Sequence, residues 1–246
     1  MEKTAEIYGI RAVIEAIKAE KPINKLYIQK GLQGSLMREL DVLVQDKGIS
    51  TSHVPVQKLN RLCSRNHQGV VAHISPVNFH SLEEMVEGAL EKTEPALFLL
   101  LEGVSDVRNF GAIIRTAACT GVNGIVVPHK GAAPVNADTV KTSAGAVFNI
   151  PIAKVAHIKD AVYYLQASGV KVIAVTEKTE KSLYDLDFKQ PIALIMGSED
   201  IGISPSTIKV SDDRAKLPMQ GSIESLNVSV ACGIALYEVL RQRLQS

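Results

Sequence analysis

The apolar positions follow a different pattern in the first 75 residues than in the rest of the chain. Two stretches there have apolar residues every three or four positions, at Ile10–Ala19 and Ser35–Gln45, and two shorter runs, KLYIQKG and GVVAHISP, are strand-like. These patterns predict two helices and two strands. We therefore expect a small α/β domain over residues 1–75.

The next segment, residues 76–95, has a different character. Its run SLEEMVEGALEKTEP predicts a helix that begins after a capping Ser81, carries acidic residues in its first turn and ends before Pro95. We expect this segment to link the first domain to a second one.

From residue 96 to residue 246 the apolar positions form short continuous runs. Four of them, LFLLLEGV, GIVVP, VKVIAVT and IALIMGSE, alternate with helical stretches such as Phe110–Cys119 and Lys159–Ser168. This alternation is typical of a parallel sheet covered by helices. Ligands bind such sheets where loops leave the carboxyl ends of the strands. The loops in which we expect chemistry follow Val104, Met196 and Leu217.

Composition and charge narrow the class of protein. With 246 residues and 46% hydrophobic residues, the chain has enough apolar side chains for a core in each of two domains. The net charge of +1 argues against a protein that coats nucleic acid indiscriminately. Residues 1–75 hold 11 Lys and Arg against 7 Asp and Glu, while residues 76–95 hold 1 against 5. A mildly basic front part thus precedes an acidic spacer, although solvated surface charge would give the same counts.

Several classes of protein and site have no support in the sequence. No apolar run reaches the roughly 18–20 residues that cross a bilayer, and MEKTAEIYGIRAV lacks a basic start followed by an apolar block. Three widely spaced cysteines, Cys63, Cys119 and Cys232, indicate neither a disulfide framework nor a zinc site. The six histidines form no metal-binding pair. We expect a cytoplasmic protein with no resident metal and no membrane contact.

The first of the three loops continues as SDVRNFGAIIRTAACTGV. Asn109 can cap the helix that starts there, and Arg115 emerges about one and a half turns later, so both can reach one cleft. Gly111 between them allows another backbone or a ligand to come close. The alternative is a capping asparagine and a solvent-facing arginine.

The second loop, IMGSEDIGIS, resembles a phosphate loop only superficially. Gly197 and Gly202 have the G-x-x-x-x-G spacing, but Ile203 stands where the phosphate-binding lysine would be, which excludes a P-loop NTPase. No G-x-G-x-x-G follows a predicted strand, which counts against a dinucleotide-binding oxidoreductase. What remains is a carboxylate, Glu199, bracketed by glycines, or simply a turn.

The third loop lies in LPMQGSIESLNVSVACGIALYEVLRQR. Ser225 or Asn227 can cap the last helix, and small residues such as Gly233 and Ala235 allow another helix to pack closely. The turn before that helix also places backbone donors and acceptors where the base of an adenosine ligand could bind.

The motifs NFGAIIRTA, IMGSEDIGIS and LPMQGSIESLNVSVA, in this order, resemble those of the SpoU/TrmH family, the RNA ribose 2'-O-methyltransferases of the SPOUT superfamily. The front runs IYGIRAVIEAI, LYIQKG and NHQGVVA are similar to the ribosomal-protein-L30-like RNA-binding domain of the longer bacterial members, which commonly modify a guanosine of 23S rRNA. The resemblance implies an α/β SPOUT domain with a deep trefoil knot, S-adenosylmethionine as methyl donor, and a homodimer.

The resemblance also implies roles for individual residues. Cofactor-binding positions correspond to Gly197, Leu217, Met219 and Leu226. The catalytic group corresponds to Asn109, Arg115, Glu199, Ser225 and Asn227. The RNA contacts that we expect come from Arg11, Asn66, His67 and Gln68, although an ordinary loop histidine is the alternative at His67. Departures are slight, with Asp200 where glycine is common and Leu217 where isoleucine is common.

One implied role conflicts with elementary chemistry. In the family, the residue matching Arg115 is assigned as the base, yet a guanidinium normally stays protonated. A safer hypothesis is that Arg115 grips the adjacent phosphate and stabilises the developing alkoxide, while the proton leaves through water or another side chain. The remaining alternatives for function are a tRNA methyltransferase, a non-catalytic ribosome-assembly factor and, least supported, an oxidoreductase or nucleotide-binding protein.

Overall fold

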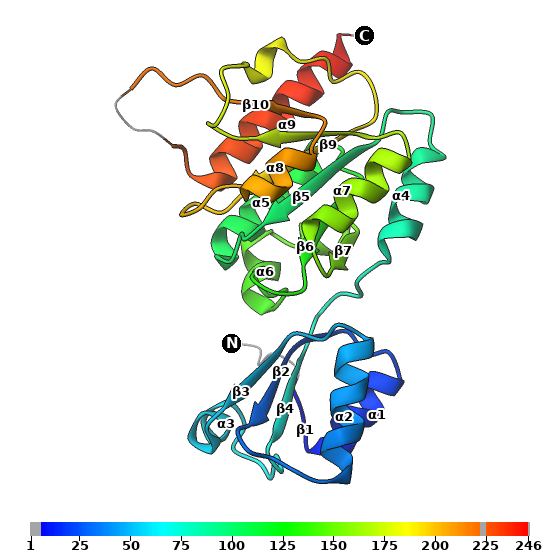
Figure 1. Cartoon of the computed structure of the whole chain (residues 1–246), viewed down its shortest axis with the longest axis vertical. Coiled ribbons are helices and arrows are strands. Elements are labelled where there is room, and N and C mark those ends of the chain that lie inside the picture. The colour runs from blue at the N-terminus through cyan, green and yellow to red at the C-terminus, as the bar shows by residue number, and fades with distance from the viewer. Residues whose placement is uncertain (1–5, 222–224, 246) are drawn as a thin grey trace. The chain divides into compact units, whose positions relative to one another are not determined.

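A computed structural model describes residues 6–221 and 225–245 (Figure 1). The chain divides into two compact units, residues 1–78 with 134–138, and residues 79–133 with 139–246. The division thus falls three residues later than the expected domain end at residue 75. Among the described residues, no helix has both the length and the apolar character to cross a membrane.

The first unit is a four-stranded sheet with helices on both faces. Its elements are β1 (Glu6–Tyr8), α1 (Ile10–Lys18), β2 (Ile23–Gln29), α2 (Ser35–Asp46), β3 (Thr51–Val54), α3 (Val56–Leu62) and β4 (Val70–Ile74). The strand order is β1-β4-β2-β3, and only β2 and β3 run parallel. Both predicted helices and both predicted strands are confirmed.

Two separate apolar clusters hold this unit together. Alternate residues of β2 and β4, including Leu26 and Val70, pack with α1 and α2 on one face. On the other face α3 covers a smaller cluster around Leu59 and Val71 (Figure 1). The second face is therefore only partly covered, since α3 has about two turns against about six for α1 and α2 together.

The second unit contains the predicted parallel sheet. Its strands are β5 (Leu97–Glu102), β6 (Gly124–Pro128), β7 (Ile152–Val155), β8 (Lys171–Val175), β9 (Ile192–Gly197) and β10 (Asp213–Ala215), in the order β10-β8-β9-β5-β6-β7. The other elements are α4 (Leu82–Leu90), α5 (Val107–Cys119), α6 (Ala137–Thr142), η1 (Ala146–Phe148), α7 (Ile158–Ala167), η2 (Leu183–Asp185), α8 (Pro205–Val210) and α9 (Val228–Leu244). All strand pairs are parallel. The trefoil knot stays a prediction.

Helix α4 belongs to this unit rather than to a free linker. Ser81 caps it as predicted, because the Ser81 hydroxyl accepts a hydrogen bond of 3.1 Å from the Glu84 amide. Its buried face, with Met85 and Val86, joins the cluster that contains Phe98 of β5 and the buried side of α7. The segment 76–95 thus differs from the expected linker, since most of it packs on the sheet of the second unit.

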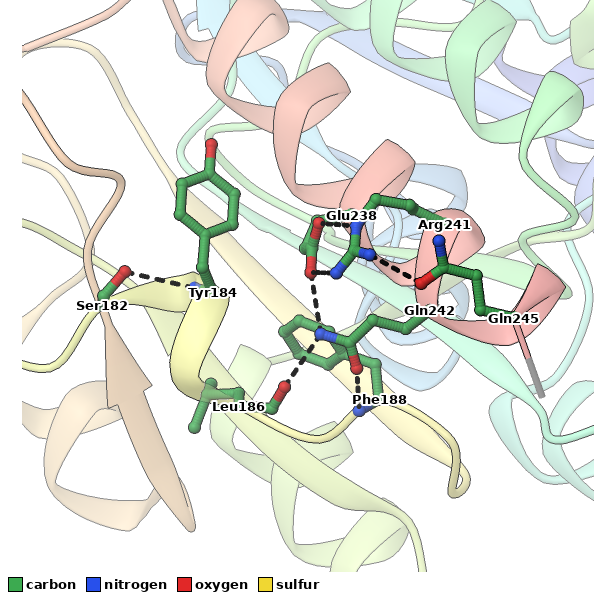
Figure 2. A network of polar contacts seen from close by, with 8 residues as sticks. All are labelled: Ser182, Tyr184, Leu186, Phe188, Glu238, Arg241, Gln242 and Gln245. Carbon is green, nitrogen blue, oxygen red and sulfur yellow. Dashed lines mark hydrogen bonds and ion pairs between the residues drawn. The ribbon is translucent and has the colours of Figure 1, made fainter.

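The last helix, α9, is fixed at its carboxyl end by a polar network (Figure 2). The buried Glu238 binds both Nε and Nη2 of Arg241 at 2.8 Å, and the Arg241 guanidinium holds the pKa of the Glu238 carboxyl below its usual value. Gln242 donates to the Leu186 carbonyl and accepts from the Phe188 amide, each at 3.0 Å. These contacts tie α9 to the segment between η2 and β9.

Arg243 adds a second attachment at the same end of α9. Its guanidinium donates to the carbonyls of Pro95 at 2.6 Å and Phe188 at 3.0 Å, and more weakly to those of Ala96 and Gln190. Both arginines of the last turn, Arg241 and Arg243, thus make specific side-chain bonds in addition to any interaction with the helix dipole. Because a helix is stiff, bonds at the carboxyl end of α9 also restrict the position in space of its first residues, next to Asn227.

Candidate active site

Three segments that are far apart in sequence meet at the carboxyl edge of the parallel sheet. Strand β5 pairs with β9 so that Glu102 lies opposite Gly197, which places the two following loops side by side. Asn109, from α5, donates its amide to Glu199 Oε1 at 3.1 Å. Asn227, before α9, donates to Asn109 Oδ1 at 3.1 Å and to Glu199 Oε1 at 2.5 Å. The structure thus joins Asn109, Glu199 and Asn227, which we call the amide–carboxylate group.

Asn109 can take part because another residue caps its helix. Asp106, not Asn109, is the N-cap of α5, since Asp106 Oδ1 accepts from the amides of Arg108 at 2.8 Å and Asn109 at 2.9 Å. The expected capping role of Asn109 is therefore wrong. Its side chain lies inside the first turn, where it is available for Glu199.

Asn227 both caps α9 and belongs to the amide–carboxylate group. Its Oδ1 caps α9 by accepting from the amides of Ser229 at 3.0 Å and Val230 at 3.4 Å, while its Nδ2 binds the other two members of the group. An amide side chain can do this because its oxygen accepts while its nitrogen donates. Of the two predicted caps, Asn227 is confirmed, and Ser225 is instead an exposed residue at the cavity described next.

A cavity of about 240 Å³ lies beside this group. It is lined by all four residues predicted to bind a cofactor and by two predicted for catalysis: Gly197, Leu217, Met219, Leu226, Glu199 and Ser225. Met219 and Leu226 are 41% and 38% exposed. Large apolar side chains that stay exposed around a cavity fit a ligand with a flat apolar part, such as a nucleoside base.

The sequence analysis missed one wall of the cavity. Val175, Thr176, Glu177 and Lys178 line it from the end of β8. The sequence contains a signal for this wall: the run VKVIAVT predicts a buried strand, and loops at the carboxyl ends of parallel strands bind ligands.

The loop after β9 is folded back tightly on the strand. A Cβ added to Gly197 would lie 2.1 Å from the Gly202 carbonyl carbon and 2.3 Å from the Ile203 nitrogen. The Gly202 amide donates to the Ser198 carbonyl at 3.0 Å, and Gly202 has a φ of 71°. Both glycines are thus required by the turn itself. The predicted turn is present, and it holds the Glu199 carboxylate next to Asn109, while a functional role for Glu199 stays a prediction.

Gly111 has a similar role on α5. A Cβ there would lie 1.9 Å from Thr142 Oγ1 and 3.0 Å from the Ser143 amide nitrogen. The missing side chain therefore accommodates a neighbouring chain segment, which is one of the two purposes expected for this glycine.

Arg115 stands apart from the amide–carboxylate group. It is exposed on α5, and no hydrogen bond or ion pair joins it to any other residue in the described part of the chain. The structure therefore leaves this guanidinium free to bind a ligand rather than holding it against Glu199.

The residues predicted to contact RNA differ in exposure. Arg11, Asn66 and Gln68 are exposed, but His67 is buried. The His67 Nδ1 accepts from the Gly69 amide at 3.0 Å, which leaves Nε2 to donate to Asn60 Oδ1 at 2.8 Å. Both ring nitrogens are thus used inside the protein. This favours the alternative given for His67, an ordinary loop histidine, over a contact with RNA.

Comparisons with known proteins agree with this geometry. Residues 96–237 match the SpoU rRNA Methylase family, and residues 7–80 match the family described as RNA 2'-O ribose methyltransferase substrate binding. The chain is 37% identical over 246 residues to the 23S rRNA (guanosine-2'-O-)-methyltransferase RlmB of Pseudomonas aeruginosa, covering 99% of this chain and 98% of that one. It is 34% identical over 244 residues to an uncharacterized tRNA/rRNA methyltransferase of Mycobacterium ulcerans, covering 98% and 78%.

A solved structure is similar along nearly the whole chain. The SpoU methyltransferase AviRb from Streptomyces viridochromogenes, in complex with the cofactor AdoMet, superposes with a TM-score of 0.62 at 26% identity. The superposition covers 98% of this chain and 91% of that one.

Proposed function

Because the chain belongs to the SpoU rRNA methylase family, we propose that it transfers a methyl group from S-adenosylmethionine to the ribose 2'-hydroxyl of a guanosine in 23S rRNA. The observation that carries this proposal is the amide–carboxylate group of Asn109, Glu199 and Asn227, assembled from three loops beside an apolar-lined cavity.

Each part of the site has a task in this reaction. S-adenosylmethionine, when bound, supplies an electrophilic methyl group. Leu217, Met219 and Leu226 offer apolar surface for its adenine, and Gly197 gives the turn that closes one wall of the cavity. The residues present therefore fit a nucleoside cofactor.

The remaining groups act on the RNA. Arg115 binds the phosphate next to the target ribose and stabilises the negative charge that develops on the 2'-oxygen. The proton of the 2'-hydroxyl passes to water, because a guanidinium normally keeps its own protons. Glu199, held by two amides, and the hydroxyl of Ser225 keep the ribose aligned for transfer.

Incubating the protein with labelled S-adenosylmethionine and unmodified 23S rRNA, with unmodified tRNA in parallel, tests this proposal. We expect label on the 2'-oxygen of one guanosine of 23S rRNA, located by mapping the modified ribose. Label on tRNA alone would favour the tRNA alternative. Binding of both S-adenosylmethionine and rRNA without transfer would favour a non-catalytic assembly factor.

Replacing Asn227 by serine separates its two roles. Serine is also a good N-cap, so the free energy of unfolding should change by no more than about 0.5 kcal/mol. The lost amide no longer orients Glu199 and Asn109, and we expect turnover to fall roughly 10- to 100-fold, as misplaced catalytic groups commonly cause. Asn227→Ala, which loses the cap as well, should reduce both stability and turnover. Wild-type turnover in the serine variant would contradict a catalytic role for the amide.

We also propose that the chain forms a homodimer through α9. Val230 and Tyr237, two turns apart on this helix, are 50% and 55% exposed, and together they leave an apolar strip of α9 uncovered. Packing within the chain accounts for two of the small residues, because Ala235 is fully buried and Gly233 lies near Thr116 of α5. An RNA substrate and three free cysteines favour the cytoplasm as its location.

A further inference from the structure

The half-covered face of the first unit carries a row of side chains that crosses three strands. Tyr8 of β1 and Tyr27 of β2 both lie opposite Val71 of β4, so the three side chains share one face of the sheet. Both tyrosines pack against the small cluster under α3 and remain partly exposed. His73 packs edge-on against Tyr27, with ring centres 5.2 Å apart.

Cations lie over both tyrosine rings. Lys58 Nζ is 5.9 Å from the centre of the Tyr27 ring, and Arg65 Cζ is 5.7 Å from the centre of the Tyr8 ring. Arg65 also donates to the Tyr8 hydroxyl at 3.1 Å. Neither cation forms an ion pair within the part of the chain that the structure describes.

The surrounding chain is unusually poor in acids. Residues 47–82 contain four Lys and Arg and no Asp or Glu. On α3, a hollow of about 520 Å³ is lined by Lys58 and Arg61 together with Pro55, Gln57 and Leu62. The acid on this face, Glu6, lies 3.8 Å from His73 Nε2, and the cations around α3 give a positive surface that attracts phosphates.

We propose that this face of the first unit, formed by Tyr8, Tyr27, Lys58, Arg61 and Arg65, binds an unpaired nucleotide of the RNA substrate. The base stacks on the tyrosine rings, where the cations move outward to admit it, and the cations bind the flanking phosphates. The inference rests on the proposed function, because it names the surface that selects RNA for the methyl-transfer site.

Aromatic rings combined with free cations fit single-stranded RNA better than either a duplex or a protein. Unstacked bases are recognised by stacking on aromatic side chains and guanidinium groups, whereas A-form duplexes keep their bases stacked inside. The surface also continues toward the loop that holds Asn66 and Gln68, because Asn60 of α3 is hydrogen-bonded to His67 of that loop. The surface therefore adjoins two of the three exposed residues predicted to contact RNA, whereas Arg11 lies on α1, which packs on the other face.

The test uses the full-length protein and two fluorescent probes, an oligouridylate and an RNA duplex, each of about 12 nucleotides per strand, a length within the range of single-strand sites. The Kd of each probe is measured by anisotropy between about 50 and 200 mM salt. Tyr8→Leu with Tyr27→Leu should weaken oligouridylate binding about 10-fold or more, because it removes stacking surface. Tyr8→Phe with Tyr27→Phe, which keeps the rings, should bind within about twofold of wild type by the same argument.

A charge variant gives an independent reading if the leucine variant folds poorly. Arg61→Gln with Arg65→Gln should lower the slope of log affinity against log salt by about 1.4, since each phosphate contact to a single strand adds about 0.7. Arg38→Gln is the matched control, because Arg38 is exposed on α2, which packs on the opposite face.

The outcomes separate this inference from the proposed function. Wild-type affinity and salt slope in the leucine and glutamine variants would overturn the inference and leave the face to a protein partner, even if the enzyme methylates rRNA. Equal loss for the duplex and the oligouridylate would also overturn it, because a stacking site needs unpaired bases. If the variants lose oligouridylate binding but the wild-type protein transfers no methyl group to any RNA, the surface stands and the proposed function fails.

Discussion

Replacing Arg115 by alanine is expected to lower turnover by about 10²–10³-fold, the usual cost of removing a group that stabilises developing negative charge. The Kd for S-adenosylmethionine should stay within about twofold, because Arg115 does not line the cavity. The reason for the large effect is that the 2'-oxygen gains charge only as the proton leaves, so the guanidinium helps the transition state more than the bound substrate. Single-turnover kinetics and calorimetry measure the two quantities separately.

Two further variants define what Arg115 does. Arg115→Lys keeps the charge but not the planar fork, so near-normal turnover in it would rule out an essential two-pronged phosphate contact. Arg108, exposed on α5 seven residues earlier, projects from nearly the same side of the helix. Arg108→Ala should raise KM without lowering kcat. An equal loss of kcat in Arg108→Ala would show a general charge effect rather than a specific contact.

Replacing Gly197 by alanine is expected to damage both the fold and the cofactor site. The added methyl group would meet backbone atoms of Gly202 and Ile203, which cannot rotate away as a side chain could. Forcing an atom into a packed site costs about 1–3 kcal/mol and sometimes more. Because the same turn forms a wall of the cavity, the Kd for S-adenosylmethionine should rise at least about tenfold, equivalent to about 1.4 kcal/mol.

Gly88 provides the matched control for that substitution. It lies exposed in the last turn of α4, and a Cβ there would meet nothing within 4 Å. Gly88→Ala should therefore raise the free energy of unfolding by about 0.5–1 kcal/mol, because alanine favours helix and loses less backbone freedom. Thermal unfolding and cofactor titration of the two variants decide the matter. A Gly197→Ala protein as stable and as tightly binding as wild type would show that the loop can open without cost.

Elements with long apolar runs could be predicted from the sequence, whereas strands of only three or four residues could not. The strands β5 and β9 are continuous buried runs, and their pairing put Glu199 near α5 as expected from a parallel sheet. Strands β1, β3 and β10 have three or four residues each, too few to show a period. They form because neighbouring strands offer hydrogen-bonding partners, which a local pattern does not contain.

The roles of some site residues, likewise, depend on contacts that only the folded chain contains. The segment SDVRN contains both Asp106 and Asn109, and either side chain can cap a helix, so only the folded chain shows that Asp106 does. The burial of His67 likewise depends on Asn60, which approaches it through the turn after α3. By contrast, the resemblance to the family grouped Glu199 with Asn227, and the two side chains are hydrogen-bonded, although no local pattern contains that bond.

The double role of Asn227 has a consequence for folding during synthesis. The residue that starts the last helix also completes the amide–carboxylate group, and the helix is held in place by side chains from Glu238 to Arg243. A chain under synthesis gains the residues from Glu238 to Arg243 only after every strand of the sheet has been made. During synthesis the strands of the sheet can therefore pair before the amide–carboxylate group is complete.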